Sequence, residues 1–421
     1  RYHHPNVLLV IADQWGGRAA DGSGRNQMLR LPAIRRLAAE GTVFTNAYSA
    51  FPVCSPARVS MFTGRMPSHF GIRGNFWKKS AVPLSIPTLG EIFAGAGYDV
   101  AYFGKDHTGG TALRGATEFG ELTFSGAGML AEGNLFDPVF TRSLINYLRA
   151  PRKRSFFATL SLINPHDICN VPKNDKSPCA GLYIGDATNQ FQERYLRGEP
   201  LPPLPFNHRA PVPDWFWLKP HQGDENWWRK YLAVYYLLIE NTDWLIATVL
   251  DELDRQGLRE NTIVLFTSDH GDQMGAHQLT QKGVLFEEAS RVPFILSAPG
   301  RVPENHRSHQ LVSHIDILPT LCGLAGVKPP SASELAVDLA ASLRGDHAPR
   351  RFLVTENAYA RMLRMGHWKY IRAGGGKEIL FNLAKDPGEG RDFMGEARGV
   401  ADQALPLLRK WCRAAGDPFR I

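Results

Sequence analysis

The sequence predicts an α/β protein in which a doubly wound, mostly parallel sheet is covered by helices. Two observations carry this prediction. Short apolar runs of strand length alternate with helical patterns, and this alternation is typical of parallel sheets with crossover helices. The chain has 421 residues, of which 43% are hydrophobic and 21% charged, so it can bury a large core without help from disulfide bonds or structural metal ions.

The strands are the first elements to justify. Short apolar runs without alternation are typical of strands that are buried on both faces. Four of them end in polar residues, and we place these strands at Asn6 to Asp13, Asp99 to Gly104, Ser155 to Ile163 and Thr262 to Thr267. A further strand is expected at Arg291 to Ser297.

Helical spacing of apolar residues places the helices between these strands. The strongest pattern covers Trp228 to Gln256, and Gly257 ends it. Weaker helical patterns stand at Pro32 to Glu40, Thr88 to Ala96 and Ile315 to Ala325. Residues 180–224 are rich in proline and aperiodic, so we expect a long surface excursion there.

The pattern changes near the end of the chain, and we predict two domains. Residues 1–335 form the large α/β domain, and residues 336–421 form a smaller α+β subdomain. In the subdomain we expect antiparallel strands at 361–372 and 378–383, around the turn Gly374 to Gly376, and a terminal helix at 400–412.

Charge and hydropathy exclude several classes of function. The formal net charge is +7, which favours anionic partners. The sequence has no block of five like charges and no zinc-finger, homeodomain or RNA-recognition pattern, so we expect no nucleic-acid binding.

The most apolar long stretch, Tyr231 to Leu250, contains acids, so we expect no membrane span. The chain begins without a signal-peptide pattern, which fits either a protein that is not exported or one already trimmed.

Five cysteines leave the redox compartment open. Cys169 and Cys179 close a short loop and could pair. Cys322 and Cys412 could form a second pair or could be buried apolar residues.

The polar residues that follow the four strands are the informative feature. They are Asp13 with Gln14, Lys105 to His107, Asn164 to His166, and Asp269 with His270. In open α/β sheets, sites lie outside the carboxyl ends of the strands. We therefore expect the four endings to converge on one pocket.

A cysteine motif stands apart from these endings. In Cys54-Ser55-Pro56-Ala57-Arg58, Ser55 can act as an N-cap and Pro56 as the first helical residue. This places Cys54 at a helix N-terminus close to Arg58. Such a position lowers a thiol pKa and attracts anions.

The motif Cys54-x-Pro56-x-Arg58 resembles the sequence that the formylglycine-generating enzyme recognises in type I sulfatases, a family of the alkaline phosphatase superfamily. The resemblance covers Asn6 to Asn382. It implies a sulfuric ester hydrolase whose large mixed, mostly parallel sheet is sandwiched by helices, with the catalytic site in residues 1–335. The other motifs that carry it are Gly104-Lys105-Asp106-His107, Asn164-Pro165-His166-Asp167, Ser268-Asp269-His270-Gly271-Asp272, Lys282 and Gly366-His367-Trp368-Lys369-Tyr370.

The resemblance also implies a nucleophile and a metal site. In that family the cysteine is oxidised to formylglycine, and the hydrate of this aldehyde attacks sulfur, so Cys54 is expected to take that role. One Ca²⁺ ion is implied, with the ligands Asp13, Gln14, Cys54, Asp269 and His270. Gln14 stands where many family members have a second acid. An imidazole is an awkward Ca²⁺ ligand, so His270 could instead bond the substrate.

The remaining catalytic residues follow from the same resemblance. Arg58 is expected to hold the hydrate and the metal-side oxygens, while Lys105 and Lys282 hold sulfate oxygens as point charges. His107 is expected to bond the formylglycine hydroxyl as a base. His166 is the expected general acid toward the leaving oxygen, because histidine titrates in the useful range.

A sulfated carbohydrate, such as a glycosaminoglycan, is the expected substrate, because aromatic faces stack on sugar rings and cations meet sulfate. The candidate residues at the rim of the site are Arg73, Asn75, Trp77 and His367. The implied partners are this saccharide and a formylglycine-generating enzyme that matures Cys54. The implied location is periplasmic or secreted.

Three alternatives stay open. A phosphonate monoester or phosphodiester hydrolase of the same superfamily can use the same nucleophile. A metal phosphatase or phosphomutase would carry Ser or Thr in place of Cys54 and would need two transition metals. An inactive protein that binds sulfated glycans is disfavoured by the intact Lys105 and His166.

Overall fold

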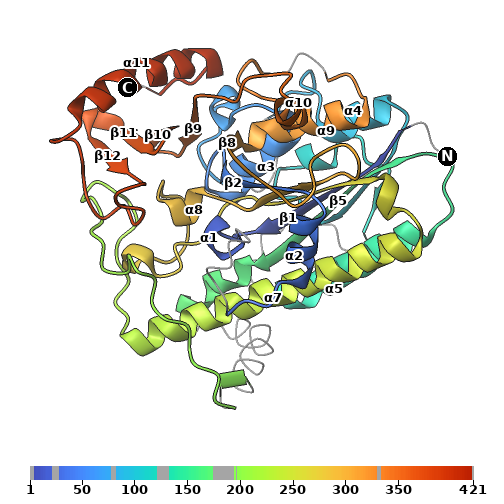
Figure 1. The fold of residues 1–421 in the computed structure, drawn as a ribbon, viewed down its shortest axis with the longest axis horizontal. Helices are drawn as coiled ribbons and strands as arrows, with labels where there is room; N and C mark the ends of the chain where they lie inside the picture. Colours follow the sequence, from blue (N-terminus) through green and yellow to red (C-terminus); the bar gives the residue numbers. More distant parts are fainter. Residues whose placement is uncertain are drawn as a thin grey trace.

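The structure is a computed structural model (Figure 1) that describes residues 4–20, 28–76, 82–120, 132–173, 194–195, 197–329 and 333–419. Within these residues, the strands of the large sheet are β1 (Asn6–Asp13), β2 (Thr42–Tyr48), β3 (Asp99–Gly104), β4 (Glu118–Phe119), β5 (Phe156–Pro165), β6 (Thr262–Ser268), β7 (Phe294–Ser297) and β8 (His306–Ser313). The strands of a second sheet are β9 (Phe352–Glu356), β10 (Ala360–Met365), β11 (Trp368–Ala373) and β12 (Glu378–Asn382). The α-helices are α1 (Gly17–Ala20), α2 (Pro32–Ala39), α3 (Cys54–Thr63), α4 (Leu89–Gly95), α5 (Gly133–Arg149), α7 (Glu225–Arg255), α8 (Glu287–Ser290), α9 (Ile317–Ala325), α10 (Leu339–Arg344) and α11 (Arg398–Ala415).

The large sheet is mixed but mostly parallel, as the sequence predicts. Its strand order is β4-β3-β5-β1-β6-β7-β2-β8. In the described part of the chain, β7 is the strand that runs antiparallel to its neighbours β6 and β2. The central strand β1 has parallel partners on both sides, β5 and β6. The carboxyl ends of these three strands therefore lie at one edge of the sheet.

Helices cover both faces of this sheet, and β1 supplies both cores. Its alternate side chains Leu8 and Val10 join the core under α2, α5 and α7. The side chains of Val7 and Leu9 join the core under α3, α4 and α9 on the other face. Figure 1 shows α5 and α7 on one side of the sheet and α3, α4 and α9 on the opposite side. Every residue of β1 is buried, which explains its unbroken apolar sequence.

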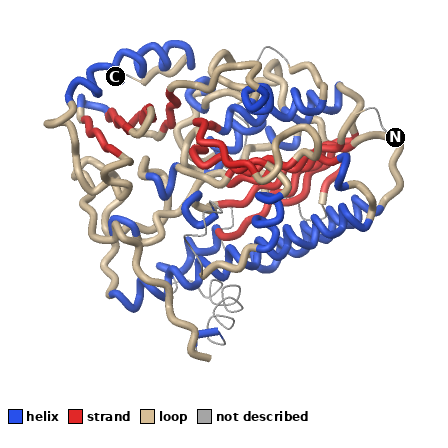
Figure 2. The backbone as a smooth tube through the Cα atoms, viewed as in Figure 1, coloured by secondary structure: helices blue, strands red, loops and turns tan. Residues whose placement is uncertain are grey.

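The second sheet is antiparallel, in the order β12-β11-β10-β9, and Figure 2 shows its strands apart from the central sheet. The terminal helix α11 covers it, with Leu408 and Trp411 in the same core as Leu363 and Tyr370. The smaller α+β unit is therefore present as predicted. Its boundary at residue 335 stays a prediction, since α10 adds Leu339 to a core of the large sheet.

Two details of the subdomain and sheet differ from the predictions. The expected strand at 361–372 is wrong, because β10 and β11 form a hairpin there. The turn contains Gly366, whose φ is +55°, and an exposed histidine follows it. Sequence patterns also missed β8, an edge strand whose polar side chains leave no apolar run, and α5, which carries an internal Pro138.

The cysteines in the described residues are free thiols. Pairing of Cys322 with Cys412 is wrong, since the two are buried in different cores, and the alternative of buried apolar residues holds. Cys169 is also free, which argues against its pairing with Cys179. Cys179 itself lies outside the described residues.

None of the described helices combines the length and the apolar character that crossing a bilayer requires.

Candidate active site

The polar residues at the ends of four neighbouring strands meet in one buried region. Asp13 ends β1, Lys105 follows β3, His166 follows β5 and Asp269 follows β6. These strands are consecutive in the sheet, in the order β3-β5-β1-β6. The Nζ atom of Lys105 lies 2.6 Å from Asp13 Oδ2, so the endings converge as expected.

Gly104 brings the Lys105 segment close to β5. Its φ is +113°, and a Cβ atom at this position would lie 1.9 Å from the carbonyl oxygen of Ser161. The Lys105 N–H donates to the same carbonyl at 2.9 Å. Glycine is required here because any side chain would push β3 away from β5 and move Lys105 out of the site.

Cys54 is the first residue of α3, and its side chain is buried. The expectation that Ser55 caps this helix is wrong. Val53 occupies the N-cap position, and no side chain caps the helix. The Ser55 N–H instead donates to Asn75 Oδ1 at 2.9 Å, and Ser55 Oγ accepts from the Phe76 N–H at 3.4 Å. These bonds tie the segment around Asn75 to the helix end that carries Cys54.

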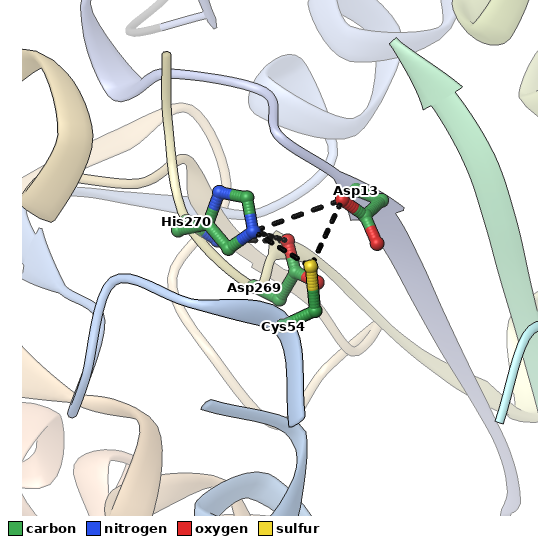
Figure 3. Close-up of side chains that lie close together, drawn as sticks. All are labelled: Asp13, Cys54, Asp269 and His270. Carbon is green, nitrogen blue, oxygen red and sulfur yellow. Dashed lines mark hydrogen bonds and ion pairs between the residues drawn. The ribbon is translucent and has the colours of Figure 1, made fainter. Parts of the chain in front are cut away.

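The centre of the site is a cluster of Asp13, Cys54, Asp269 and His270 (Figure 3). All four are buried, and their ligand atoms lie within 4.8 Å of one another. The Cys54 Sγ atom lies 3.2 Å from His270 Nε2 and 3.8 Å from Asp13 Oδ1. The His270 Nε2 atom lies 3.5 Å from Asp269 Oδ1. Figure 3 shows these groups pointing toward a common centre.

Cations hold the outer oxygens of both carboxylates. Arg58 Nη2 donates to Asp13 Oδ2 at 3.1 Å, and Arg58 Nε donates to Asp269 Oδ2 at 2.9 Å. Lys105 binds Asp13 Oδ2 as well. In the structure, Arg58 and Lys105 therefore orient the carboxylates, whereas the roles expected for them were at the hydrate and at sulfate oxygens.

The acidic groups of the cluster respond differently to burial. Burial and the Cys54 charge oppose ionisation of Asp13, but Lys105 and other cations outweigh them and lower its pKa. Burial and the Asp13 charge raise the pKa of Asp269. Burial raises the pKa of the Cys54 thiol too, but Lys105 and Lys282 outweigh it and hold that pKa well below its usual range. Burial disfavours the imidazolium form of His270, yet Asp269 and Cys54 outweigh this effect and raise its pKa. The cluster therefore concentrates negative charge and attracts protons or a cation.

This arrangement fits a cation. Among the described residues, Asp13 Oδ1 has Cys54 and His270 as polar neighbours, while Arg58 and Lys105 bind the other carboxylate oxygen. The two carboxylates offer the oxygen ligands that Ca²⁺ prefers. A formylglycine at position 54 would replace the soft sulfur with oxygen, which improves the match to a hard ion.

Two further histidines approach the nucleophile from the strand ends. His107 lies close enough to Cys54 to interact with its charge, and burial lowers the pKa of the His107 imidazole. For His166, burial disfavours the charged form, but the neighbouring Cys169 outweighs it and raises the pKa to about 9. His107 is therefore mainly neutral and His166 mainly protonated near pH 7.

The Gln14 side chain is hydrogen-bonded to Asp272 and Lys282. Its Nε2 donates to Asp272 Oδ2 at 2.7 Å, and its Oε1 accepts a short hydrogen bond from Lys282 Nζ. Asp272 is itself fixed by the Tyr231 hydroxyl at 2.9 Å. Asp272 therefore positions Gln14, and Gln14 in turn positions Lys282. Gln14 as a metal ligand stays a prediction.

Sequence reasoning missed Cys169 as a residue of the site. Its Sγ lies 3.1 Å from Gln14 Oε1, 3.1 Å from Gln281 Oε1 and 3.3 Å from Lys282 Nζ. The signal was present, because Cys169 stands three residues after His166. It was hidden by the alternative of a disulfide.

The expected substrate residues lie in different places. Arg73 lines a cavity of about 170 Å³ that also contacts Val53 and Gly283, the chain neighbours of Cys54 and Lys282. Asn75 holds the backbone of Ser55, as described above. Trp77 lies outside the described residues. His367 is exposed in the β10–β11 turn, with its ring 5.1 Å from that of Trp368.

Residues 5–327 match the family described as Sulfatase. The chain belongs to the sulfatase family. This match, with a sheet of the expected kind, confirms the assignment to the type I sulfatases of the alkaline phosphatase superfamily and the sulfuric ester hydrolase class.

Individual relatives extend over nearly the whole chain. This sulfatase is 30% identical to a Delta 4,5-hexuronate-2-O-sulfatase of Bacteroides thetaiotaomicron, over 99% of this chain and 90% of that protein. It is 27% identical to a choline-sulfatase of Rhizobium meliloti, over 98% of this chain and 86% of that protein. The solved structure of a 2-O GAG sulfatase is similar with a TM-score of 0.82 and 26% identity, covering 99% of this chain and 93% of that one. The relatives thus include both saccharide and non-saccharide sulfatases.

Proposed function

We propose that this sulfatase hydrolyses a sulfate ester of a saccharide, using formylglycine at position 54 and one Ca²⁺ ion. The observation that carries the proposal is the buried cluster in which Cys54 faces the inner oxygens of Asp13 and the imidazole of His270. A residue at a helix start, surrounded by cations and oxygen ligands, is well placed to act as an activated nucleophile on an anionic ester.

The formylglycine hydrate supplies the attacking hydroxyl and, through its second hydroxyl, a route for the release of sulfate. His107 lies near residue 54 and is mainly neutral, so it is placed to accept a proton from that second hydroxyl. Arg58 keeps Asp13 and Asp269 in place on either side of the nucleophile.

The bound Ca²⁺ ion supplies charge neutralisation for sulfate oxygens and a fixed position for the nucleophile. Asp13, Asp269 and His270 would hold it, with residue 54 as a further ligand. Lys282 is anchored by Gln14 and by Cys169, so its ammonium group can hold a sulfate oxygen without having to be ordered on binding.

His166 is the proposed general acid. The leaving alkoxide needs a proton, and His166 carries one at neutral pH because its pKa is raised to about 9. Its Nδ1 atom makes no hydrogen bond to the described residues. Such a group can turn toward the leaving oxygen.

The saccharide part of the proposal rests on the relatives that are named for hexuronate and GAG sulfates. An exported location, periplasmic or secreted, belongs to the same proposal, because sulfated polysaccharides are met outside the cytoplasm. Maturation requires a formylglycine-generating enzyme as partner.

The experiment begins with protein produced together with a formylglycine-generating enzyme. Mass spectrometry of the peptide that carries Cys54 measures conversion, and sulfate release from sulfated sugars is compared with hydrolysis of phosphodiesters and phosphonate monoesters. Cys54→Ala is the matched control. We expect conversion of Cys54, sulfate release by the converted protein and none by the control.

Two results would contradict the proposal. Faster turnover of phosphodiesters or phosphonates would favour the alternative hydrolase of the same superfamily. Tight binding of a sulfated sugar without turnover, by protein with converted Cys54, would favour an inactive binding protein.

A further inference from the structure

The cavity beside the nucleophile carries information about the substrate. Its volume of about 170 Å³ is well below the roughly 300–1,000 Å³ of drug-sized pockets, so it takes a single ring. Val53 and Gly283 in its wall directly adjoin Cys54 and Lys282 in the chain. A group bound there would therefore lie beside the two residues that we propose to act on the sulfate.

Two aromatic side chains from distant segments form the mouth of this cavity. Trp217 is 50% exposed and Tyr359 is 59% exposed, although both are large and apolar. Trp217 belongs to the segment before α7, and Tyr359 to the β9–β10 turn of the subdomain. Exposed aromatic faces at a cavity mouth are suited to stack on a sugar ring.

The aromatic residues are fixed relative to the catalytic loop. Trp217 Nε1 donates to the Gly283 carbonyl at 3.3 Å, and Asn357 Nδ2 donates to the same oxygen at 3.0 Å. Gly283 has a φ of +87°, and a Cβ there would lie 2.8 Å from the Trp217 ring. The rim and Lys282 are therefore one rigid unit, so a ring held at the rim has a defined position relative to the sulfate site.

Arg73 gives this cavity a charge. It is exposed and makes no hydrogen bond or ion pair with the described residues. No acidic side chain lines the cavity within the described chain. The segment that carries Arg73 is tied to the nucleophile helix through Asn75 and Ser55, at 2.9 Å. An unpaired guanidinium beside aromatic faces is suited to bind a carboxylate or a sulfate.

We infer that the sugar that carries the reacting sulfate also carries a second anionic group, which Arg73 binds while Trp217 and Tyr359 stack on the ring. This inference rests on the proposed saccharide sulfatase function and narrows it to a substrate class. The second group is a uronate carboxylate or another sulfate, and the experiment separates the two.

The experiment compares three sulfated sugars of the same size. One is a neutral monosulfated sugar, one is a monosulfated uronate, and one is a disulfated sugar without a carboxylate. The protein carries converted Cys54, and kcat/KM is measured for the wild type, Arg73→Gln and Arg73→Lys. Arg409→Gln, an exposed arginine on α11, is the control for a change of net charge.

We expect the wild type to prefer one of the two anion-bearing sugars. Arg73→Gln should lower kcat/KM on that sugar by about 10- to 100-fold more than on the neutral one, mainly through KM, because a charge-assisted hydrogen bond is lost. The kcat/KM of Arg73→Lys on that sugar should lie between the values of the wild type and Arg73→Gln. Lysine keeps the positive charge but lacks the planar guanidinium group that forms two parallel hydrogen bonds. The preferred sugar identifies the second group.

Variants at the aromatic rim test the rest of the inference. Trp217→Ala and Tyr359→Ala should lower kcat/KM by a similar factor for all three sugars, because stacking on the ring does not depend on the second charge. Trp244→Ala, at an exposed tryptophan on α7, is the matched control.

Equal kcat/KM of the wild type on the three sugars, or an equal loss on all three in Arg73→Gln, would overturn the inference and leave the proposed function intact. Absence of sulfate release from every sugar by the converted wild type would instead overturn the proposed function.

Discussion

Two buried clusters of charged side chains in this sulfatase differ in how they arrange their charges. In the active site, Asp13, Cys54 and Asp269 bring like charges together around one point. Between the large sheet and the subdomain, Glu287, Lys369 and Glu389 alternate acid, base and acid. Lys369 Nζ lies 3.1 Å from Glu287 Oε1 and 2.7 Å from Glu389 Oε1.

The second cluster, which we call the interface cluster, also satisfies its acids with neutral donors. The Tyr48 hydroxyl donates to Glu287 at 3.0 Å, and the Glu287 N–H donates to Glu389 Oε2 at 2.7 Å. Burial opposes ionisation of Glu287, but Lys369 and Arg291 outweigh it and lower its pKa to about 2.

This difference in charge arrangement distinguishes a cluster that stabilises the fold from a cluster that binds a ligand or catalyses a reaction. Buried ions are tolerated when each is paired and hydrogen-bonded. The interface cluster places a base between its two acids, whereas in the active site Arg58 and Lys105 bind the carboxylates from the outer side only. Buried acids that face a common centre and have their cations on one side indicate a site that is completed by a ligand.

The largest expected effect comes from removing one inner carboxylate. Asp13→Asn should abolish Ca²⁺-dependent stabilisation and lower kcat/KM on the order of 1,000-fold, because several kcal/mol of charge stabilisation are lost. Wild-type Tm should rise with Ca²⁺ and fall on chelation, while the Tm of Asp13→Asn should not respond. Asp251→Asn, at an exposed aspartate on α7, is the control. An unchanged Ca²⁺ response in Asp13→Asn would remove Asp13 from the metal site.

Breaking the interface cluster should affect stability instead. Lys369→Met leaves two buried carboxylates without their shared cation and should lower the free energy of unfolding by about 3–5 kcal/mol. Chemical denaturation measures this loss, and Lys377→Met, at an exposed lysine, is the control. Adding Glu389→Gln to Lys369→Met should recover part of the loss. A loss in Lys369→Met no larger than in the control would show that the cluster is not structurally important.

The next prediction concerns Glu356, a buried acid that belongs to neither cluster. Burial raises its pKa from 4.5 to about 7 despite Arg361. Because the raised pKa means that the folded state keeps its proton longer, stability should fall as pH rises from about 4.5 to 7, by up to about 3 kcal/mol. Denaturation of the wild type and Glu356→Gln at pH 5 and pH 8 measures this, and the variant should lack this part of the pH dependence. Parallel pH profiles of the two proteins would contradict the raised pKa.

The smallest expected effect is at Cys169. Cys169→Ala removes a contact of both Gln14 and Lys282, together with the charge that raises the pKa of His166, and should lower kcat/KM by about tenfold, near the 1–1.5 kcal/mol of one hydrogen bond. Cys169→Ser restores the contacts but not the charge, so it should recover only part of this activity. Cys322→Ala, at a buried thiol in a core, should affect stability rather than activity. Equal activity of Cys169→Ala and the wild type would mean that the thiol only fills space.

Much of the fold was predictable because its signals are local. The runs that became β1, β3, β5 and β6 are buried on both faces, so hydrophobicity alone marks them. The edge strand β8 was missed because half-exposed strands carry polar residues. The hairpin of β10 and β11 was missed because Gly366 and His367 interrupt the two strands only briefly.

The residues of the site divide in the same way, into those that a local sequence signal marks and those that it does not. Asp13, Lys105, His166 and Asp269 were predictable because each directly follows a buried strand. Trp217 and Tyr359 were not, because they lie in segments without periodicity. Their positions depend on bonds to Gly283 and on the docking of the subdomain, which no local pattern encodes.

The sequence by itself determined the sheet, the chemical types at its strand ends and the motif around Cys54, because neighbouring residues and short-range periodicity specify all three. Only the tertiary structure decided that Arg58 holds the carboxylates, that Gln14 and Cys169 anchor Lys282, and that Arg73 lines one cavity with Trp217 and Tyr359. The physical reason is that side-chain partners are chosen by packing between distant segments, where distance and burial set the strength of each contact.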